Sequence, residues 1–167
     1  MSAKKILITG GAGFVGSHLA DALLHADHDV RIFDSFSAQV HGSGVPEYLS
    51  PEVEVIRGDM RDAAAVRRAL DGVDVVFHLA AAVGVGQSMY QIADYMGANT
   101  QGTAVLLQSL LDTKADVEKL VLASSMSIYG EGQYLCGNCG DVSPGPRGSD
   151  QLLQKRWRCF ARNAAPS

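Results

Sequence analysis

The chain reads Thr9-Gly10-Gly11-Ala12-Gly13-Phe14-Val15-Gly16 directly after a short apolar run at residues 6–8 and directly before a helical pattern. The glycines satisfy two overlapping spacings, G-x-G-x-x-G from Gly11 and G-x-x-G-x-x-G from Gly10. Such spacing suits a tight turn with positive φ, a close approach of backbone to a pyrophosphate, and close packing of helix on strand. The free amides and positive dipole at the start of the helix can then hold phosphates. The stretch therefore predicts a phosphate-binding turn, with a purely structural glycine turn as the alternative.

A carboxylate stands at the end of the second predicted strand. Asp34 directly follows the apolar run at residues 30–33 and lies eighteen positions after Gly16. A carboxylate in this place can accept hydrogen bonds from the hydroxyl groups of an adenosine ribose, and it repels a 2′-phosphate. Together, the glycine turn and Asp34 predict NAD rather than NADP as the bound dinucleotide.

Short β-branched runs alternate with helical patterns along the first 130 residues. The runs predicted to be strands are residues 6–8, 30–33, 53–56, 73–77 and 120–122. Asp62 is a suitable N-cap for the helix that follows the third of them. This alternation predicts an α/β fold, a Rossmann-type doubly wound parallel sheet with helices on both faces and about five strands. A sheet of that size is incomplete for the fold, so we expect an exposed apolar edge.

The remaining segments are less regular. Residues 35–51 are predicted to be a loop, and residues 88–111 a long helical region with irregularities at Gly97 and Gly102. After Tyr129, Gly, Pro and Cys accumulate and no further strand is predicted. We interpret residues 1–130 as the N-terminal part of a dinucleotide-binding domain. Residues 131–167 then form a Cys-containing loop or insertion, and a substrate domain is absent.

The composition excludes several classes of protein. Of 167 residues, 47% are hydrophobic and 19% charged, which is typical of a globular domain rather than a disordered chain. A net charge of -4 argues against nucleic acid or an anionic membrane as the partner. No apolar run approaches the ~20 residues of a membrane span, and three clustered cysteines do not suggest a disulfide framework. We expect a cytoplasmic protein.

Beyond the generic fold, several motifs in the same order resemble the extended short-chain dehydrogenase/reductase family, specifically its NAD-dependent sugar epimerases and dehydratases. Residues 9–16 are similar to the phosphate loop of that family, which adds Phe14 and Val15 to the expected cofactor site. Asp59 and Met60 match the segment whose aspartate contacts the adenine ring. Asp59 could instead simply cap a turn.

Two further motifs extend the resemblance. Leu79, Ala80 and Ala81 match the turn that lines the nicotinamide-ribose side, and His78 before them is interpreted as a packing histidine. Asn99 matches a structural asparagine of the long helix, although any polar residue could stand there.

The resemblance also implies a catalytic residue and a mechanism. Aligned on Tyr129 and Gly130, the catalytic serine or threonine of the family falls on Ser125. In such a 4-epimerase a tyrosinate removes the C4 hydroxyl proton of a nucleotide sugar while hydride passes to NAD and later returns. A lysine four residues after the tyrosine lowers the pKa of the tyrosine from its usual value near 10. None of the five tyrosines here has a lysine four positions on, so we expect negligible turnover by this chain.

Residues 41–49 and 82–90 are similar to the dTDP-L-rhamnose 4-epimerase subgroup, close to the UDP-glucose 4-epimerases. We therefore expect the N-terminal NAD-binding part of a nucleotide-sugar 4-epimerase, a truncated or frameshifted reading of a longer gene; the full-length enzyme is expected to form a homodimer. A 4,6-dehydratase or reductase is one alternative, although Met126 and Ser127 stand where dehydratases usually carry Asp-Glu. A non-catalytic NAD-binding regulatory module is the other.

The cysteines form a knuckle-like motif. Cys136 and Cys139 flank a Gly-Asn turn, and two thiolates so spaced suit tetrahedral Zn²⁺. The subgroup would complete four zinc ligands with a second C-x-x-C pair, but only Cys159 follows here. A zinc site and unligated thiols in a loop therefore remain as alternatives.

Overall fold

The structure is a computed structural model that describes residues 2–42, 44–114, 116–130, 132–138 and 140–157. The chain divides into two compact units, residues 1–123 and residues 124–167, and each is described by itself. The domain boundary expected between residues 130 and 131 remains a prediction.

The elements of the first unit are β1 (Lys5–Thr9), α1 (Phe14–Leu24), β2 (Asp29–Asp34), α2 (Ala38–His41), β3 (Glu54–Arg57), α3 (Ala63–Ala69), β4 (Val75–His78), α4 (Val85–Ser88), α5 (Ile92–Tyr95), the π-helix η1 (Met96–Gln101), α6 (Gly102–Thr113) and β5 (Lys119–Leu122). Those of the second are the 3-10 helix η2 (Met126–Tyr129), β6 (Tyr134–Cys136), β7 (Gly140–Val142) and α7 (Ser149–Leu153).

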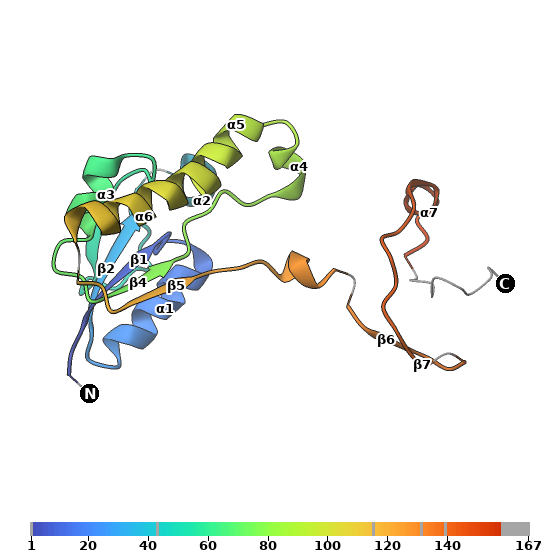
Figure 1. Ribbon diagram of the computed structural model, residues 1–167, viewed down its shortest axis with the longest axis horizontal. Coiled ribbons are helices and arrows are strands. Elements are labelled where there is room, and N and C mark those ends of the chain that lie inside the picture. Colours follow the sequence, from blue (N-terminus) through green and yellow to red (C-terminus); the bar gives the residue numbers. More distant parts are fainter. Residues whose placement is uncertain (1, 43, 115, 131, 139, 158–167) are drawn as a thin grey trace. The chain divides into compact units, whose positions relative to one another are not determined.

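The first unit contains a five-stranded parallel sheet in the order β3-β2-β1-β4-β5 (Figure 1). This arrangement confirms the predicted doubly wound α/β class. The chain builds outward from β1 to β3 and then crosses back to place β4 on the other side of β1. In such sheets ligands bind beyond the carboxyl ends of the strands at the crossing point. Here that point lies beside Thr9, which is in register with Phe33 of β2 and His78 of β4.

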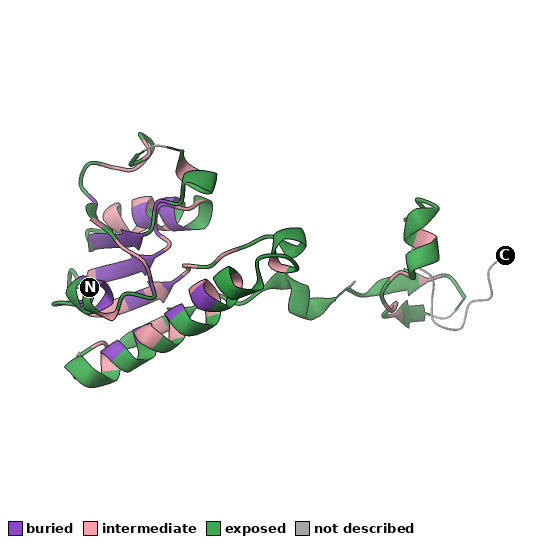
Figure 2. Ribbon diagram, turned by 90° about the horizontal axis from the view of Figure 1, so that it is seen from above, coloured by how far each residue is buried: buried purple, intermediate pink, exposed green. Residues whose placement is uncertain are grey.

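Helices cover both faces of the sheet. Side chains of each strand alternate between the two faces, so each strand has apolar side chains that pack against helices on either face. Ile6, Ile8 and Ile32 pack with residues of α1 on one face. Leu7 packs on the other face with residues of α3 and α6. Figure 1 shows α1 on one side of the sheet and α3 with α6 on the other, and Figure 2 shows the buried residues gathered on the strands. The near-continuous apolar character of β1 is therefore the mark of a strand covered on both faces.

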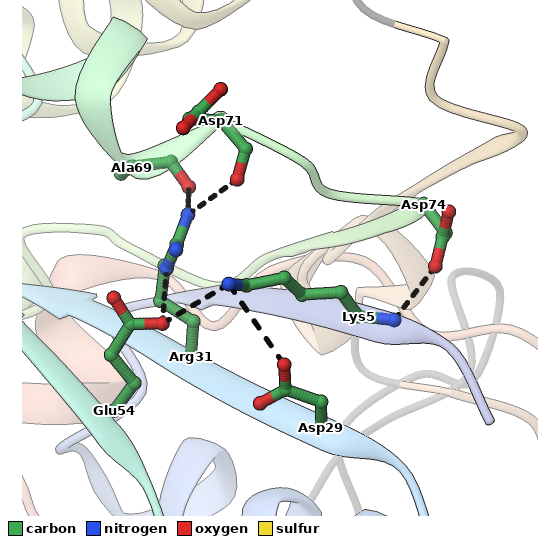
Figure 3. Close-up of polar contacts among 7 residues, drawn as sticks. All are labelled: Lys5, Asp29, Arg31, Glu54, Ala69, Asp71 and Asp74. Atoms are coloured by element: carbon green, nitrogen blue, oxygen red, sulfur yellow. Dashed lines mark hydrogen bonds and ion pairs between the residues drawn. The ribbon is translucent and has the colours of Figure 1, made fainter.

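A buried cation joins three elements of the first unit, although arginine is rarely buried without partners. Arg31 of β2 donates from Nε to the carboxylate of Glu54 in β3 at 2.8 Å. Its Nη1 donates to the carbonyl oxygens of Ala69 and Asp71 at 2.7 and 2.9 Å, around the end of α3 (Figure 3). Lys5 Nζ lies 3.4 Å from the same Glu54 carboxylate. Arg31 thereby satisfies carbonyl groups that the end of a helix leaves unpaired.

The helical region after residue 84 is irregular where the sequence predicts it. Gly97 lies inside the π-helix η1, and Gly102 begins α6 directly after it. A Cβ on Gly102 would lie only 2.8 Å from the Cβ of Met60, so glycine here allows the helix to approach the segment after β3. The expected irregularities are confirmed.

The predicted loop at residues 35–51 contains the short helix α2. The expectation of no strand after Tyr129 is wrong, because β6 and β7 form an antiparallel hairpin with Cys136 opposite Gly140. Strands of three residues are too short to show an alternating pattern, and the positive φ of Gly140 (73°) suits a tight hairpin loop. Within the described residues β5 is a sheet edge, and its Val121 and Leu122 are 36% and 58% exposed.

Across the described ranges, no helix combines the length and the apolar character that a membrane crossing requires.

Candidate functional site

The glycine turn lies at the carboxyl end of β1 and leads into α1. Gly13 is the N-cap of α1, and no side chain caps the amides of the first helical turn. Phe14 and Val15 are 80% and 62% exposed, so this end of the helix opens onto the surface of the unit. Uncapped amides and the positive end of the helix dipole together favour an anion. The turn can therefore hold a phosphate group chemically.

Each glycine of the turn serves a different steric need. A Cβ on Gly10 (φ 69°) would lie 2.7 Å from the amide nitrogen of Ala80, and one on Gly11 would lie 2.4 Å from Ile32 Cγ2. A Cβ on Gly16 would lie 2.5 Å from the carbonyl oxygen of Gly10. At Gly13 the clash would be mildest, because the nearest atom to an added Cβ is the carbonyl oxygen of Gly10 at 3.3 Å. Glycine at these positions therefore keeps the turn tight and packs the start of α1 closely against it.

Asp34 is buried and is bonded to the glycine turn. Its Oδ2 accepts the amide N–H of Ala12 at 3.1 Å, and its Oδ1 accepts the amide N–H of Phe36 at 2.9 Å. The ring Nε2 of His41 lies 3.8 Å from Oδ1. The structure therefore brings together the two features, Asp34 and the glycine turn, on which the expectation of NAD rests.

A tyrosine that the sequence analysis did not single out fixes the segment after β2. The hydroxyl of Tyr48 donates to the carbonyl oxygen of Ala12 at 2.6 Å and lies 3.5 Å from Nδ1 of His41. The segment between Phe36 and Tyr48 is thereby tied at both ends to the glycine turn and Asp34. No local pattern marks these contacts, because Tyr48 and Ala12 are 36 positions apart.

The residues expected to contact adenine lie at the end of β3. The carboxylate of Asp59 accepts hydrogen bonds from the amide of Arg61 at 2.8 Å and from its guanidinium. The side-chain hydrogen bonds of Arg61 hold the pKa of Asp59 below its usual range. Met60 is buried beside Gly102, and the amide of Gly58 donates to the carbonyl oxygen of Asp34 at 2.9 Å. Asp59 is thus anionic at neutral pH, and its neighbour Gly58 is hydrogen-bonded to the backbone of Asp34.

The turn after β4 is held on both sides. On one side, the amides of Leu79 and Ala80 donate to Thr9, to its carbonyl oxygen at 3.0 Å and to its Oγ1 at 3.3 Å. On the other side, Asn99 bonds twice to the backbone of Ala82, accepting its N–H at 2.7 Å and donating to its carbonyl oxygen at 3.0 Å. Asn99 therefore does have a specific partner: it fixes the turn that contains Ala81.

His78 precedes this turn and is 3% exposed. Its Nδ1 lies 2.6 Å from Thr9 Oγ1 and its Nε2 lies 3.0 Å from Thr103 Oγ1. Burial lowers the pKa of His78, which keeps the ring neutral at pH 7. The interpretation of His78 as a buried packing histidine is confirmed, with both ring nitrogens satisfied.

Ser125 and the cysteine motif belong to the second unit. Ser125 is the N-cap of η2, and its Oγ accepts the amide N–H of Ser127 at 3.2 Å. Cys136 ends β6, whereas Cys139 and Cys159 lie outside the described residues. Within the described part of the chain, no group of three or more His, Cys, Asp or Glu side chains could hold a metal ion. The expectation of zinc therefore has no support from the structure.

Comparisons with known proteins agree with this geometry. The model of the NAD dependent epimerase/dehydratase family matches residues 6–147. A dTDP-L-rhamnose 4-epimerase from Burkholderia thailandensis is 33% identical over 98% of this chain and 46% of its own length. A UDP-glucose 4-epimerase from Neisseria meningitidis serogroup C is 35% identical over 98% of this chain and 50% of its own length.

Among solved structures, UDP-glucose 4-epimerase from Brucella ovis in complex with NAD superposes with a TM-score of 0.67 at 27% identity. The match covers 86% of this chain and 39% of that one. The chain thus spans about half the length, or less, of these relatives. Because the family model matches well over half of the sequence, the chain belongs to the NAD dependent epimerase/dehydratase family.

Proposed function

We propose that the first unit binds NAD and that the chain is the NAD-binding portion of a nucleotide-sugar 4-epimerase. The observation that carries this proposal is the bond between the Asp34 carboxylate and the Ala12 amide. Because of this bond the Asp34 carboxylate, which we propose as the ribose acceptor, lies beside the turn that leads into the uncapped amides of α1. Pyrophosphate and ribose are adjacent groups of a dinucleotide, so one ligand can use both features at once.

We assign described residues to the parts of NAD in their order along the dinucleotide. The amides around Gly13, including those of Phe14, Val15 and Gly16, would bind the pyrophosphate. Asp34 would accept the ribose hydroxyls, and Asp59 with Met60 would lie against the adenine. Leu79, Ala80 and Ala81 would line the nicotinamide-ribose side, in the turn fixed by Asn99.

Charge favours NAD over NADP. Asp34 is 9% exposed and already accepts two backbone N–H groups, one on each carboxylate oxygen. A 2′-phosphate on the ribose would bring further negative charge against this carboxylate. The potential cation beside Asp34 is His41, whose ring Nε2 lies 3.8 Å from Oδ1.

When held by the glycine turn and Asp34, NAD would supply the hydride-transfer chemistry that inversion at C4 of a nucleotide sugar requires. Ser125 would hydrogen-bond the reacting oxygen. The tyrosine-lysine pair that would remove the hydroxyl proton is absent from these 167 residues, so the chain is expected to bind cofactor without catalysing epimerisation. A homodimer and a nucleotide-sugar substrate belong to the same proposal for the full-length enzyme.

The missing tyrosine-lysine pair favours one second candidate, a non-catalytic NAD-binding module. The two proposals share the cofactor site and differ in what should happen when the pair is supplied. A longer chain containing Tyr-x-x-x-Lys would turn over nucleotide sugar if the epimerase proposal is correct. A regulatory module would remain inactive.

The experiment is calorimetric titration of the purified 167-residue chain with NAD and NADP, together with turnover assays on dTDP-L-rhamnose and UDP-glucose. We expect one NAD per chain, weaker binding of NADP and no turnover. Absence of NAD binding by a folded chain would overturn the cofactor proposal, and steady-state turnover would overturn the expectation of inactivity.

A further inference from the structure

His78 connects three elements that border the proposed nicotinamide side of the site. It ends β4, while Thr9 ends β1 and Thr103 lies in the first turn of α6. Both ring nitrogens of His78 lie within hydrogen-bond distance of a threonine hydroxyl. A residue bonded in this way can hold the three elements in a fixed arrangement.

The directions of these hydrogen bonds follow from the number of available protons. The hydroxyl of Thr103 donates its single proton to the carbonyl oxygen of Asn99 at 2.6 Å. It can therefore only accept from His78, so the proton of the neutral imidazole is on Nε2. Nδ1 is then an acceptor and receives the hydroxyl proton of Thr9.

The same hydroxyl of Thr9 accepts the amide N–H of Ala80 at 3.3 Å. The bonds thus run in one direction, from Ala80 through Thr9 and His78 to Thr103 and the carbonyl of Asn99. Asn99 in turn holds the backbone of Ala82 with its side chain. The relay begins and ends on the turn at residues 79–82, which packs against Gly10 of the phosphate-binding turn.

We infer that His78, in its neutral form with the proton on Nε2, is a positioning residue that holds the turn at residues 79–82 in the conformation that receives the nicotinamide half of NAD. This inference rests on the proposed NAD site. It assigns a role beyond packing to His78 and to Thr103.

The test compares NAD with ADP, which has the adenosine and diphosphate groups but lacks the nicotinamide riboside. Affinities are measured by calorimetry on the wild-type chain and on His78→Leu, His78→Asn and Thr103→Val. His78→Leu should lose about tenfold in affinity for NAD and less than about twofold for ADP, since it removes two modest hydrogen bonds. His78→Asn places a polar atom where Nδ1 stood, facing Thr9, and should recover most of the affinity for NAD.

Thr103→Val keeps the shape of the side chain and removes the hydroxyl, so it should also weaken NAD selectively. Thr100→Val is the matched control, because Thr100 lies in η1, is exposed, and donates from its hydroxyl to the sulfur of Met96 at 3.8 Å. It should leave both affinities unchanged. Long-range proton–nitrogen NMR spectra of the wild type should show His78 protonated on Nε2.

The outcomes separate the two claims. If the wild type binds NAD but the His78 and Thr103 variants lose affinity for NAD and ADP equally, or keep both affinities, the positioning role is refuted and the proposed function stands. A proton on Nδ1 would refute the relay in the same way. If the folded wild type does not bind NAD, the proposed function fails. Should His78→Leu not fold, the His78→Asn and Thr103→Val titrations decide the matter.

Discussion

The carboxylate of Asp34 accepts the backbone N–H of Ala12 at 3.1 Å, so the end of β2 is bonded directly to the glycine turn after β1. A second bond, from the amide of Phe36 at 2.9 Å, fixes the other carboxylate oxygen. The side chain is therefore oriented before any ligand arrives. Preorganisation of this kind lowers the entropic cost of binding, because few groups remain to be ordered.

Asp34→Ala should weaken NAD binding and reduce the preference over NADP. The variant removes the proposed ribose acceptor and the repulsion of a 2′-phosphate, and we expect a loss of about tenfold or more for NAD. Calorimetric titration with both nucleotides measures the two effects. Asp116→Ala, a change at an exposed aspartate of the same unit, serves as control. An unchanged ratio of NAD to NADP affinity in folded Asp34→Ala would contradict the assignment.

Gly16→Ala should abolish NAD binding and destabilise the first unit. Its Cβ would lie 2.5 Å from the carbonyl oxygen of Gly10, and backbone atoms cannot move aside cheaply. Gly86→Ala is the matched control, since no atom lies within 4 Å of its added Cβ and the residue lies in α4. There alanine should be neutral or stabilising by up to about 1 kcal/mol. Urea unfolding and NAD titration of both variants test this, and equal behaviour of the two would be the contrary result.

Arg31→Met should lower the free energy of unfolding by about 2–3 kcal/mol, because charge-assisted bonds to Glu54 and to two carbonyl groups are lost. Arg67→Met, at an exposed position of α3, should have little effect. The hydrogen bond from Arg31 holds the pKa of Glu54 below its usual value. The stabilisation is therefore present above the usual glutamate value of about 4.3 and is lost as the pH falls below it. The difference in urea midpoint between wild type and Arg31→Met should narrow in acid, where the Glu54 pair is lost and the bonds to the two carbonyl groups remain. A difference that is independent of pH would count against the pair.

Protonation of His78 should make folding sensitive to mild acid. Burial lowers the pKa of His78, so the unfolded chain binds the proton more readily than the folded chain does. Stability should be complete above the unfolded value of about 6.5 and should decrease as the pH falls from there toward the folded pKa. The free energy of unfolding, measured with urea between about pH 5 and 8, should change more steeply with pH for wild type than for His78→Asn. Identical slopes would argue that the imidazole is not buried in solution.

The parts of the fold that the sequence predicted are those governed by contacts over a few residues. The strand runs follow from unbroken apolar segments, and the cap follows from one side chain, since Asp62 Oδ1 accepts the amides of Ala64 and Ala65 at 2.9 and 3.1 Å. Gly97 and Gly102 predicted the irregular helix because glycine weakens helical order locally. Asp34 and the glycine turn both follow the carboxyl ends of parallel strands, so parallel topology brings them to the same end of the sheet.

The contacts that escaped prediction join residues far apart in the chain. Nothing near Arg31 in the sequence indicates that its guanidinium donates to the carbonyl groups at the end of α3, which lies about forty positions away. Tyr48 and Thr103 are likewise ordinary residues whose roles depend on partners brought close only by folding. Ser125 lies in the second unit and its catalytic role remains a prediction from resemblance.

The central claim is that the uncapped amides of α1 and Asp34 bind the two adjoining groups of one NAD molecule. Nitrogen-15 NMR of the 167-residue chain during NAD addition tests it most directly. We expect saturable shifts in the amides of residues 12–16 and in those flanking Asp34, reaching completion at one NAD per chain. Spectra that stay unchanged, or shifts confined to other parts of the molecule, would contradict it.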